Sequence, residues 1–161
     1  MSETDKIRDI IRPFVDGFRG LDLGCGGDKV TPTAIGINLN YGGQGDNADF
    51  WFDCNERLPT PDSHWEFIYS SHLLEHLSPE PTDILSHWWE KLVTNGHLII
   101  YLPHREMYTE DNPEHLRMWV TEEIESMIAS LPGSKVVLCI TEDVKKDPDR
   151  YSFLVVAQKQ L

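Results

Sequence analysis

The sequence LDLGCGG, residues 21–27, combines a short apolar run with a glycine-rich turn. Its two leucines alternate with Asp22, as expected for a short buried strand. Gly24, Gly26 and Gly27 carry no side chains, so a ligand can approach the backbone of the turn closely. We therefore predict a cofactor-binding turn at the carboxyl end of a buried strand.

The residues that follow this turn argue against a dinucleotide site. A dinucleotide-binding turn opens a helix whose amino terminus faces the pyrophosphate. Only residues 28–34, with Pro32 among them, separate the turn from the strand-like run at 35–39, so a full crossover helix does not fit. Asp28 would also direct a negative charge toward a pyrophosphate, whereas it suits a cofactor with a positive centre and an amino acid end. We predict S-adenosylmethionine as the cofactor.

Four separated segments resemble, in order, the class I S-adenosylmethionine-dependent methyltransferases, in particular small, single-domain members of the type-11-like group. They are LDLGCG at 21–26, GIN at 36–38, DCNERLP at 53–59 and FIYSSHLLEHL at 67–77. A fifth segment, at 92–101, is similar to the turn and fifth strand of that family, with Asn95-Gly96 where Pro-Gly-Gly is more usual. The resemblance covers residues 19–103 and makes methyl transfer the expected activity.

The expected fold is α/β, a Rossmann-like doubly wound sheet that is mostly parallel and ends in an antiparallel hairpin. The hydrophobic pattern predicts strands at 19–23, 35–39, 48–53, 65–70, 97–103, 135–140 and 151–157, and helices at 5–15, 81–94 and 121–131. We expect Thr121 to cap the last helix and Asn95-Gly96 to end the preceding one. The first crossover helix is expected to be reduced or absent, and residues 40–47 to form a loop.

Composition narrows the classes of partner. With 161 residues, 40% of them hydrophobic, we expect one domain over residues 1–161. The net charge of -13, from 14 basic and 27 acidic residues, argues against nucleic acid, because such binding neutralises phosphates with Lys and Arg. Cys25, Cys54 and Cys139 form no C-x-x-C pair, so neither a disulfide framework nor a thiolate zinc site is indicated. No leader or membrane-spanning run is recognisable, and we expect a cytoplasmic protein that does not bind membranes.

For the methionine end of the cofactor, the resemblance implies four residues of the glycine turn. Asp22 would anchor the amino group directly or through water, and the backbone at Gly24, Cys25 and Gly26 would approach the carboxylate. Asp22 could instead serve only to order the turn. Both interpretations stay open from the sequence.

For the adenosine end, the resemblance implies residues after the second and third strands. Asn38, followed by Leu39, stands where the family normally has an acid that accepts hydrogen bonds from both ribose hydroxyls. A neutral amide accepts more weakly than a carboxylate. Asp53 matches the acid that receives the exocyclic amine of adenine, with the Cys54 backbone beside the ring, although Asp53 could simply begin a turn.

Catalysis of methyl transfer requires donor and acceptor to be held close and, where the acceptor carries a proton, that proton to be removed. The transferable methyl group is expected beside Ser71 and His72, which follow the fourth strand. Histidine suits proton removal near neutral pH, and we predict His72 and His104 as catalytic residues. A structural hydrogen-bonding role is the alternative for each.

Acceptor contacts are expected at the end of the fifth strand and in the long loop 104–119, because such loops are often lids or binding loops. The predicted substrate residues are Tyr101, Arg105, Tyr108 and His115. We expect a small-molecule acceptor, methylated on oxygen or nitrogen. An open cofactor edge on so small a domain also suggests the hypothesis of a homodimer.

Two alternatives remain. The sequence HLLEH at 72–76 matches the inverted zincin motif H-x-x-E-H, in which His72 and His76 would chelate zinc and Glu75 would act as a base. Because this motif straddles the end of a buried strand, we predict no metal site and keep a zinc metallopeptidase as a remote alternative. The other alternative is a catalytically inactive methyltransferase-like binding protein, favoured by Asn38 and by the missing crossover helix.

Overall fold

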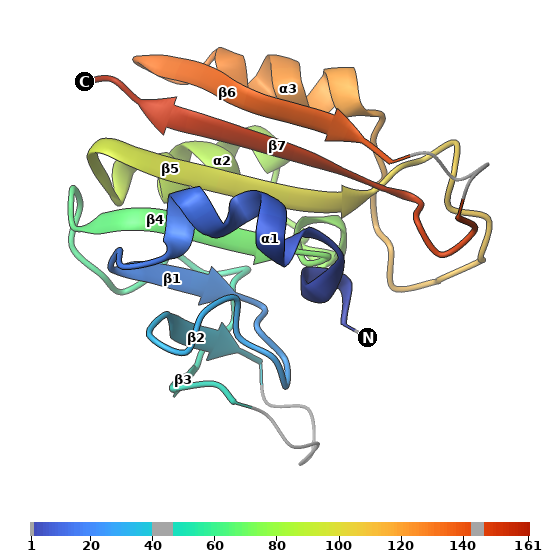
Figure 1. The fold of residues 1–161 in the computed structure, drawn as a ribbon, viewed down its shortest axis with the longest axis horizontal. Helices are drawn as coiled ribbons and strands as arrows, with labels where there is room; N and C mark the ends of the chain where they lie inside the picture. Colours follow the sequence, from blue (N-terminus) through green and yellow to red (C-terminus); the bar gives the residue numbers. More distant parts are fainter. Residues whose placement is uncertain (1, 40–46, 143–146) are drawn as a thin grey trace.

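A seven-stranded mixed sheet with the strand order β3-β2-β1-β4-β5-β7-β6 organises the protein (Figure 1). The computed structural model describes residues 2–39, 47–142 and 147–161. Its strands are β1 (Gly20–Leu23), β2 (Ile35–Asn38), β3 (Phe50–Trp51), β4 (Trp65–Ser71), β5 (Leu92–Pro103), β6 (Ser134–Thr141) and β7 (Ser152–Lys159). Its helices are α1 (Glu3–Val15), the single 3-10 turn η1 (Leu74–His76), α2 (Pro81–Glu90) and α3 (Thr121–Ala129).

Strand directions confirm the predicted topology. The pairs from β3 through β5 are parallel, whereas β7 runs antiparallel to both β5 and β6. No helix forms in residues 24–34 between β1 and β2, as predicted. The predicted loop 40–47 lies, except for Asn47, outside the described residues.

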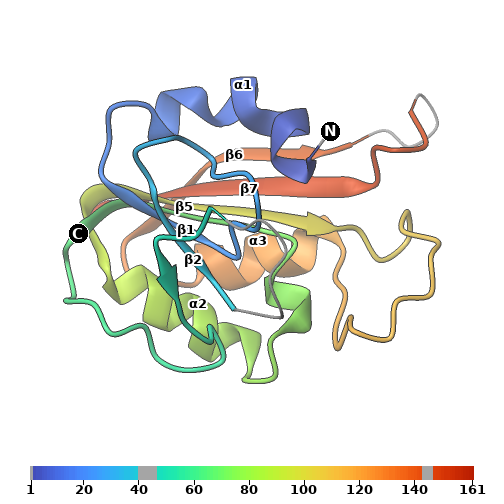
Figure 2. The same ribbon diagram turned by 90° about the horizontal axis from the view of Figure 1, so that it is seen from below.

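The helices divide between the two faces of the sheet, with α1 on one side and α2 and α3 on the other (Figure 2). On the α1 side, Ile7, Ile11 and Val15 occupy one stripe of the helix and pack into a core with Phe67 and Tyr69. A capping box formed by Ser2 and Asp5 starts this helix at Glu3, earlier than predicted. None of the helices in the described ranges has the length and apolarity needed to cross a membrane.

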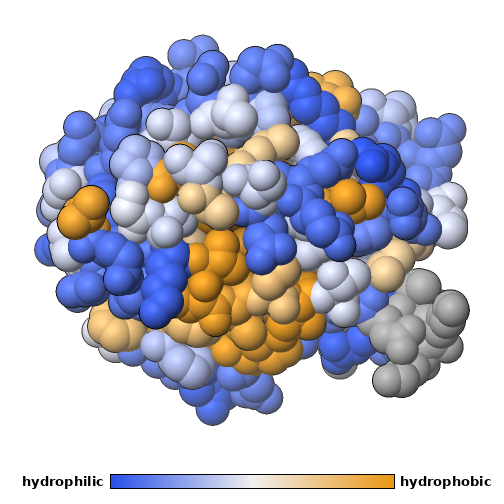
Figure 3. All heavy atoms as spheres, turned by 90° about the horizontal axis from the view of Figure 1, so that it is seen from above, coloured by the Kyte–Doolittle hydropathy of each residue, from blue (hydrophilic) through white to orange (hydrophobic). Residues whose placement is uncertain are grey.

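The opposite face carries the larger core. Trp88 and Trp89 of α2 are 1% and 3% exposed and pack with Ile124 and Ile128 of α3. Their burial gives α2 a broad apolar face in this core. On the α1 side the cover is thinner, and Phe14, Leu138 and Ile140 are only partly buried against the core. Figure 3, viewed from the β6 side, shows apolar residues gathered in one surface area.

Two predicted element ends are wrong. The helix predicted to reach residue 94 ends at Glu90, and β5 already begins at Leu92, which pairs with Trp65. Asn95-Gly96 lies inside β5, where the register shifts between the pairs Trp65–Leu92 and Phe67–His97 and Asn95 adopts a φ of 65°. The turn residues therefore form a bulge within a strand instead of a helix stop, because Leu92 and Val93 satisfy a strand pattern as well as a helical one.

The predicted cap of α3 also differs. Thr121 is the first helical residue, and its Oγ1 is hydrogen-bonded to Oγ1 of Thr141 at 2.6 Å. The helix start is held instead by Glu123, whose carboxylate accepts a hydrogen bond from the backbone N–H of Val120 at 3.0 Å. The threonine hydroxyl thus joins α3 to β6. Its partner is distant in the sequence, so the residues around Thr121 do not predict this contact.

The close packing of β1 on β4 yields a first prediction. A Cβ atom on Gly20 would overlap the ring of Phe67, so Gly20→Ala is expected to lower the free energy of unfolding by about 1–3 kcal/mol. Chemical unfolding measures this loss. Because Phe67→Leu removes the ring, the double variant should lose less stability than the sum of the two single variants. A fully additive double variant would contradict the overlap.

Candidate functional site

Two adjoining cavities lie at the carboxyl ends of β1, β2 and β4, where open α/β sheets bind their ligands. The larger, of about 420 Å³, we call the β2–β3 cavity, and the smaller, of about 210 Å³, the glycine-turn cavity. Gly24 lines both cavities, so they meet at the glycine turn.

All ten residues predicted to bind a cofactor line one cavity or the other. The β2–β3 cavity is lined by Asn38, Leu39, Asp53 and Cys54, the glycine-turn cavity by Asp22, Cys25, Gly26, Ser71 and His72, and both by Gly24. These residues come from four separate segments of the chain. Their convergence is a property of the parallel sheet, since each segment directly follows or ends a strand whose carboxyl end points to the same edge.

The glycine turn is held tightly against β2. Gly24 and Gly26 have φ values of +73° and +53°, in the left-handed region that favours glycine. The backbone N–H groups of Gly24 and Cys25 both donate to the carbonyl of Ile37, at 2.8 and 3.2 Å. A Cβ atom on Gly24 would lie 3.2 Å from the side chain of Leu73. The turn therefore leaves little room for any side chain at position 24.

Asp22 orders the turn, which is one of the two roles that the sequence left open, and it also lines the glycine-turn cavity. Its Oδ2 accepts a hydrogen bond from the backbone N–H of Val30 at 2.6 Å, which orders the chain after the turn. The residue is 1% exposed yet still contributes to the glycine-turn cavity. Burial raises the pKa of Asp22 to about 7, although the Val30 bond opposes this shift. A cation bound in this cavity would favour the ionised carboxylate.

The carboxylate of Asp28 is not a free anion, because it already has two hydrogen-bonding partners. Its carboxylate accepts hydrogen bonds from Ser2 at 2.6 Å and Arg8 at 2.7 Å, both in or before α1. These contacts tie the segment after the glycine turn to the first helix. Ser2, Glu3 and Thr4 consequently line the glycine-turn cavity, a contribution that no sequence motif indicates.

In the β2–β3 cavity, Asp53 shapes its own turn. Its Oδ1 accepts hydrogen bonds from the backbone N–H and the side-chain amide of Asn55, at 2.9 and 2.8 Å. The turn interpretation is thus correct, and the residue also lines the cavity. Cys54 beside it is buried, and burial raises the pKa of its thiol to about 12, so the thiol stays protonated near neutral pH.

His72 directly follows β4, has a φ of 49° and lines the glycine-turn cavity. Its Nε2 is hydrogen-bonded to Oγ of Ser152 at 3.0 Å. Burial lowers the pKa of His72 to about 3, so the imidazole is neutral at physiological pH. The neutral ring is available as a hydrogen-bonding group, but it is a much weaker base than an ordinary histidine.

Three of the other predicted residues lie outside both cavities and have structural partners. His104 is buried, with Nδ1 accepting from the backbone N–H of Glu106 at 3.2 Å. The hydroxyl of Tyr101 donates to Glu142 at 2.6 Å in the sheet interior. Arg105 forms an ion pair with Glu123 at 3.1 Å.

Tyr108 and His115 belong to the loop 104–119, which bends back over the sheet edge. Their rings lie 5.0 Å apart between centroids, and neither lines the two cavities. Their neighbours Glu114 and Leu116 do line the β2–β3 cavity. The loop singled out from the sequence thus reaches this cavity, but through residues other than the predicted ones. Residues that line this cavity and were not predicted are Phe52, Asn55, Leu73, His76, Leu77, Glu114 and Leu116.

The sequence matches no protein-family model and no curated protein. Solved structures do match the fold. A SAM-dependent methyltransferase from Archaeoglobus fulgidus has a TM-score of 0.67 at 18% identity, over 98% of this chain and 95% of that chain. The Burkholderia thailandensis 1,6-didemethyltoxoflavin-N1-methyltransferase, solved with 1,6-didemethyltoxoflavin and S-adenosylhomocysteine bound, has a TM-score of 0.72 at 13% identity, over 98% and 78%.

A third match widens the range of chemistry found on this fold. The [4+2]-cyclase SpnF has a TM-score of 0.67 at 17% identity, over 98% of this chain and 82% of that chain. Together, these likenesses show that the chain has the fold of the class I S-adenosylmethionine-dependent methyltransferases. They show the fold alone, since one fold carries different activities.

Proposed function

We propose that the protein is an S-adenosylmethionine-dependent methyltransferase that methylates an oxygen or nitrogen of a small molecule. The observation that carries this proposal is the convergence of the ten cofactor residues on two cavities that meet at Gly24. Two adjoining compartments of this kind suit a cofactor with an amino acid end and a nucleoside end.

In this proposal the methionine end occupies the glycine-turn cavity and the adenosine occupies the β2–β3 cavity. Asp22 receives the ammonium group, which holds the carboxylate in its ionised form. Asn38 accepts from the ribose hydroxyls, and Asp53 lies at the adenine end. Because Asn38 is neutral, its hydrogen bonds to the ribose are weaker than those of a carboxylate.

The bound cofactor would supply an electrophilic methyl group on a sulfonium sulfur. The protein's own contribution is to position the acceptor and exclude water. His72 lies at the methionine end, and its bond to Ser152 fixes the orientation of the imidazole. With its lowered pKa, His72 is suited to orient an acceptor by hydrogen bonding, and its power to remove a proton is small.

Charge supports the acceptor class. The net charge of -13 is unfavourable for nucleic acid, because such binding neutralises phosphates with Lys and Arg, so a small molecule is the better fit. Acceptor access is proposed from the loop 104–119, through Glu114 and Leu116.

Calorimetric titration with S-adenosylmethionine and S-adenosylhomocysteine tests the cofactor site. We expect binding of both ligands, weakened about tenfold in Asp53→Ala because one charge-assisted hydrogen bond is lost. Asp9→Ala, which removes an exposed acid on α1, is the charge-matched control and should bind as the unaltered protein does. Absence of binding to either ligand in the unaltered protein would refute the proposal.

A binding protein without turnover is the second candidate, and the low pKa of His72 favours it. Incubation with S-adenosylmethionine and a panel of phenols, amines and carboxylic acids separates the two. Formation of S-adenosylhomocysteine that depends on an added acceptor supports the enzyme. Cofactor binding with no such product across the panel supports the binding protein.

A further inference from the structure

Glu75 is a fully buried acid whose charge has no ordinary partner. Its side chain is 0% exposed, and within residues 2–39, 47–142 and 147–161 neither carboxylate oxygen takes part in a hydrogen bond. Burial raises the pKa of Glu75 to about 8. An unpaired carboxyl group in the protein interior is energetically costly, and a bound partner would offset this cost.

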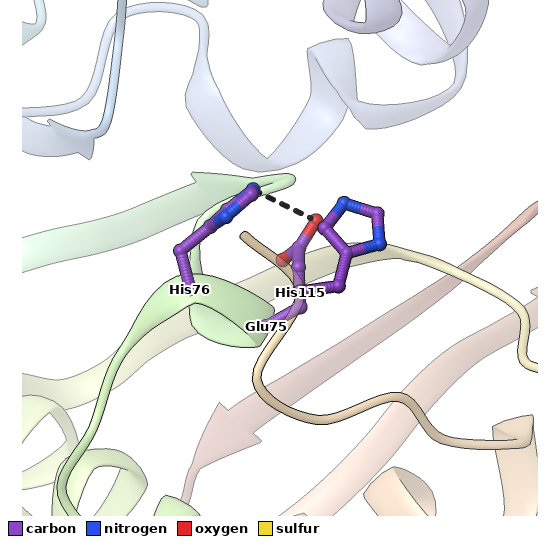
Figure 4. Close-up of side chains that lie close together, drawn as sticks. All are labelled: Glu75, His76 and His115. Carbon is purple, nitrogen blue, oxygen red and sulfur yellow. Dashed lines mark ion pairs between the residues drawn. The ribbon is translucent and has the colours of Figure 1, made fainter. Parts of the chain in front are cut away.

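Three imidazoles surround this carboxylate: His76 of η1 and His115 of the loop 104–119, drawn in Figure 4, and His72, whose Nδ1 lies 3.8 Å from Oε1 of Glu75. Nε2 of His76 lies 3.8 Å from Oε1 of Glu75. Nδ1 of His115 is buried without a hydrogen-bond partner in the described part of the chain. One ligand atom from each of Glu75, His76 and His115 lies within 4.8 Å of the other two.

The orientation of His76 is fixed by a backbone contact. Its Nδ1 lies 2.9 Å from the carbonyl oxygen of Glu114, so Nδ1 carries the proton and donates. The lone pair is then on Nε2, the nitrogen that faces Glu75. A ring nitrogen donating to a carbonyl while the other stays free is the usual arrangement of a metal-ligating histidine.

Further contacts hold the loop against η1 and so keep His115 in place. The backbone N–H groups of Leu116 and Arg117 donate to the carbonyl of Glu75, at 2.8 and 3.3 Å. The side chain of Arg117 forms an ion pair with Glu80 at 3.0 Å. These bonds anchor the two residues that follow His115 and so hold its ring near Glu75.

We propose that Glu75, His76 and His115 form a binding site for a divalent transition-metal ion, with zinc as the best fit. Two imidazoles and one carboxylate are a common zinc ligand set and leave a fourth position open. Metal–ligand bonds of about 2.0 Å at tetrahedral angles place ligand atoms about 3.3 Å apart, so the side chains close in on the ion by rotation. Because His76 and Glu114 line the β2–β3 cavity, the ion lies at its edge, within reach of a small oxygen or nitrogen ligand.

This site differs from the one implied by H-x-x-E-H, and it reverses our sequence-based prediction of no metal. Nε2 of His72 is hydrogen-bonded to Ser152, and although its Nδ1 lies 3.8 Å from Oε1 of Glu75, His72 is not part of the group whose ligand atoms all lie within 4.8 Å of one another. His115, which the sequence motif does not contain, takes the third place. The proposal does not depend on cofactor binding and stands or falls separately from it.

Tag-free protein, stripped with a chelator and without any cofactor, provides the test. Titration with ZnCl2 by calorimetry is expected to show one equivalent bound, and Co²⁺ should give the visible absorption of a four-coordinate site. His115→Ala and Glu75→Gln are each expected to weaken binding at least ~100-fold, since each removes a direct ligand. His64→Ala, which removes a histidine outside the cluster, is the control and should retain full affinity.

Thermal unfolding of each metal-free variant by circular dichroism verifies that the fold is intact. Glu75→Gln keeps the size of the side chain and removes only the charge, so it serves if a histidine variant fails to fold. No zinc binding by the unaltered protein would overturn the proposal. Loss of binding in His72→Ala with full binding in His115→Ala would overturn it in favour of the H-x-x-E-H set.

Discussion

Gly24→Leu is expected to abolish measurable binding of S-adenosylmethionine, with a loss of at least ~100-fold in affinity, equal to about 2.7 kcal/mol. Gly24 lines both cavities, and its φ of +73° directs any Cβ atom toward Leu73. A leucine side chain would therefore obstruct the place where the two cavities adjoin, at which the two halves of the cofactor are proposed to meet. Calorimetric titration at constant temperature and salt measures the loss.

Gly17→Leu is the matched control for this variant. Gly17 has a φ of +79°, and a Cβ atom there would meet nothing within 4 Å. Both substitutions impose similar backbone strain, of about 1–2 kcal/mol, but only one of them obstructs the cavities. Equal cofactor affinity in Gly24→Leu and Gly17→Leu would place the cofactor elsewhere.

Asp22→Asn is expected to stabilise the protein near neutral pH while weakening cofactor binding. The folded protein keeps Asp22 protonated up to about pH 7, whereas the unfolded chain releases this proton near pH 3.8. A carboxyl group with a raised pKa in the folded state lowers the free energy of unfolding as pH rises between these values. The slope is at most about 1.4 kcal/mol per pH unit, and asparagine does not titrate.

Chemical unfolding from pH 4 to pH 8 measures this second prediction. The stability of Asp22→Asn relative to the unaltered protein should increase by about 3–4 kcal/mol across that range. Affinity for S-adenosylmethionine should fall about tenfold or more, because the charge that receives the ammonium group is gone. Asp9→Asn, at an exposed site, should change neither quantity. A pH-independent difference between Asp22→Asn and the unaltered protein would show that Asp22 is ionised in the folded state.

Agreement between sequence and structure is best where a residue directly follows a strand. Asp22, Asn38 and Ser71 belong to the ends of β1, β2 and β4, and parallel strands bring these ends to one edge of the sheet. Ten of the residues that line the two cavities could therefore be predicted from strand patterns and four short motifs. The absence of a helix between β1 and β2 was also predictable, because the connection between these two strands is too short for one.

Disagreement is found where a side chain has two possible partners. Thr121 joins β6 instead of capping α3, and Tyr101 binds Glu142 instead of facing a cavity. Asn95-Gly96 bulges inside β5 because Leu92 pairs with Trp65 across the sheet. In each case a contact with a distant segment outweighs the structural preference of the neighbouring residues. Those residues alone do not predict that contact.

The sequence by itself determined most of the elements, the mostly parallel direction of the strands and the edge of the sheet at which we propose that a ligand binds, because these depend on hydrophobic period, turn residues and short connections. Only the tertiary structure decided that Asp22 is buried and that His115 completes a cluster with Glu75 and His76. Burial and the meeting of distant side chains depend on how the loop 104–119 packs against η1. That packing is a sum of long-range contacts, which a pattern of neighbouring residues does not encode.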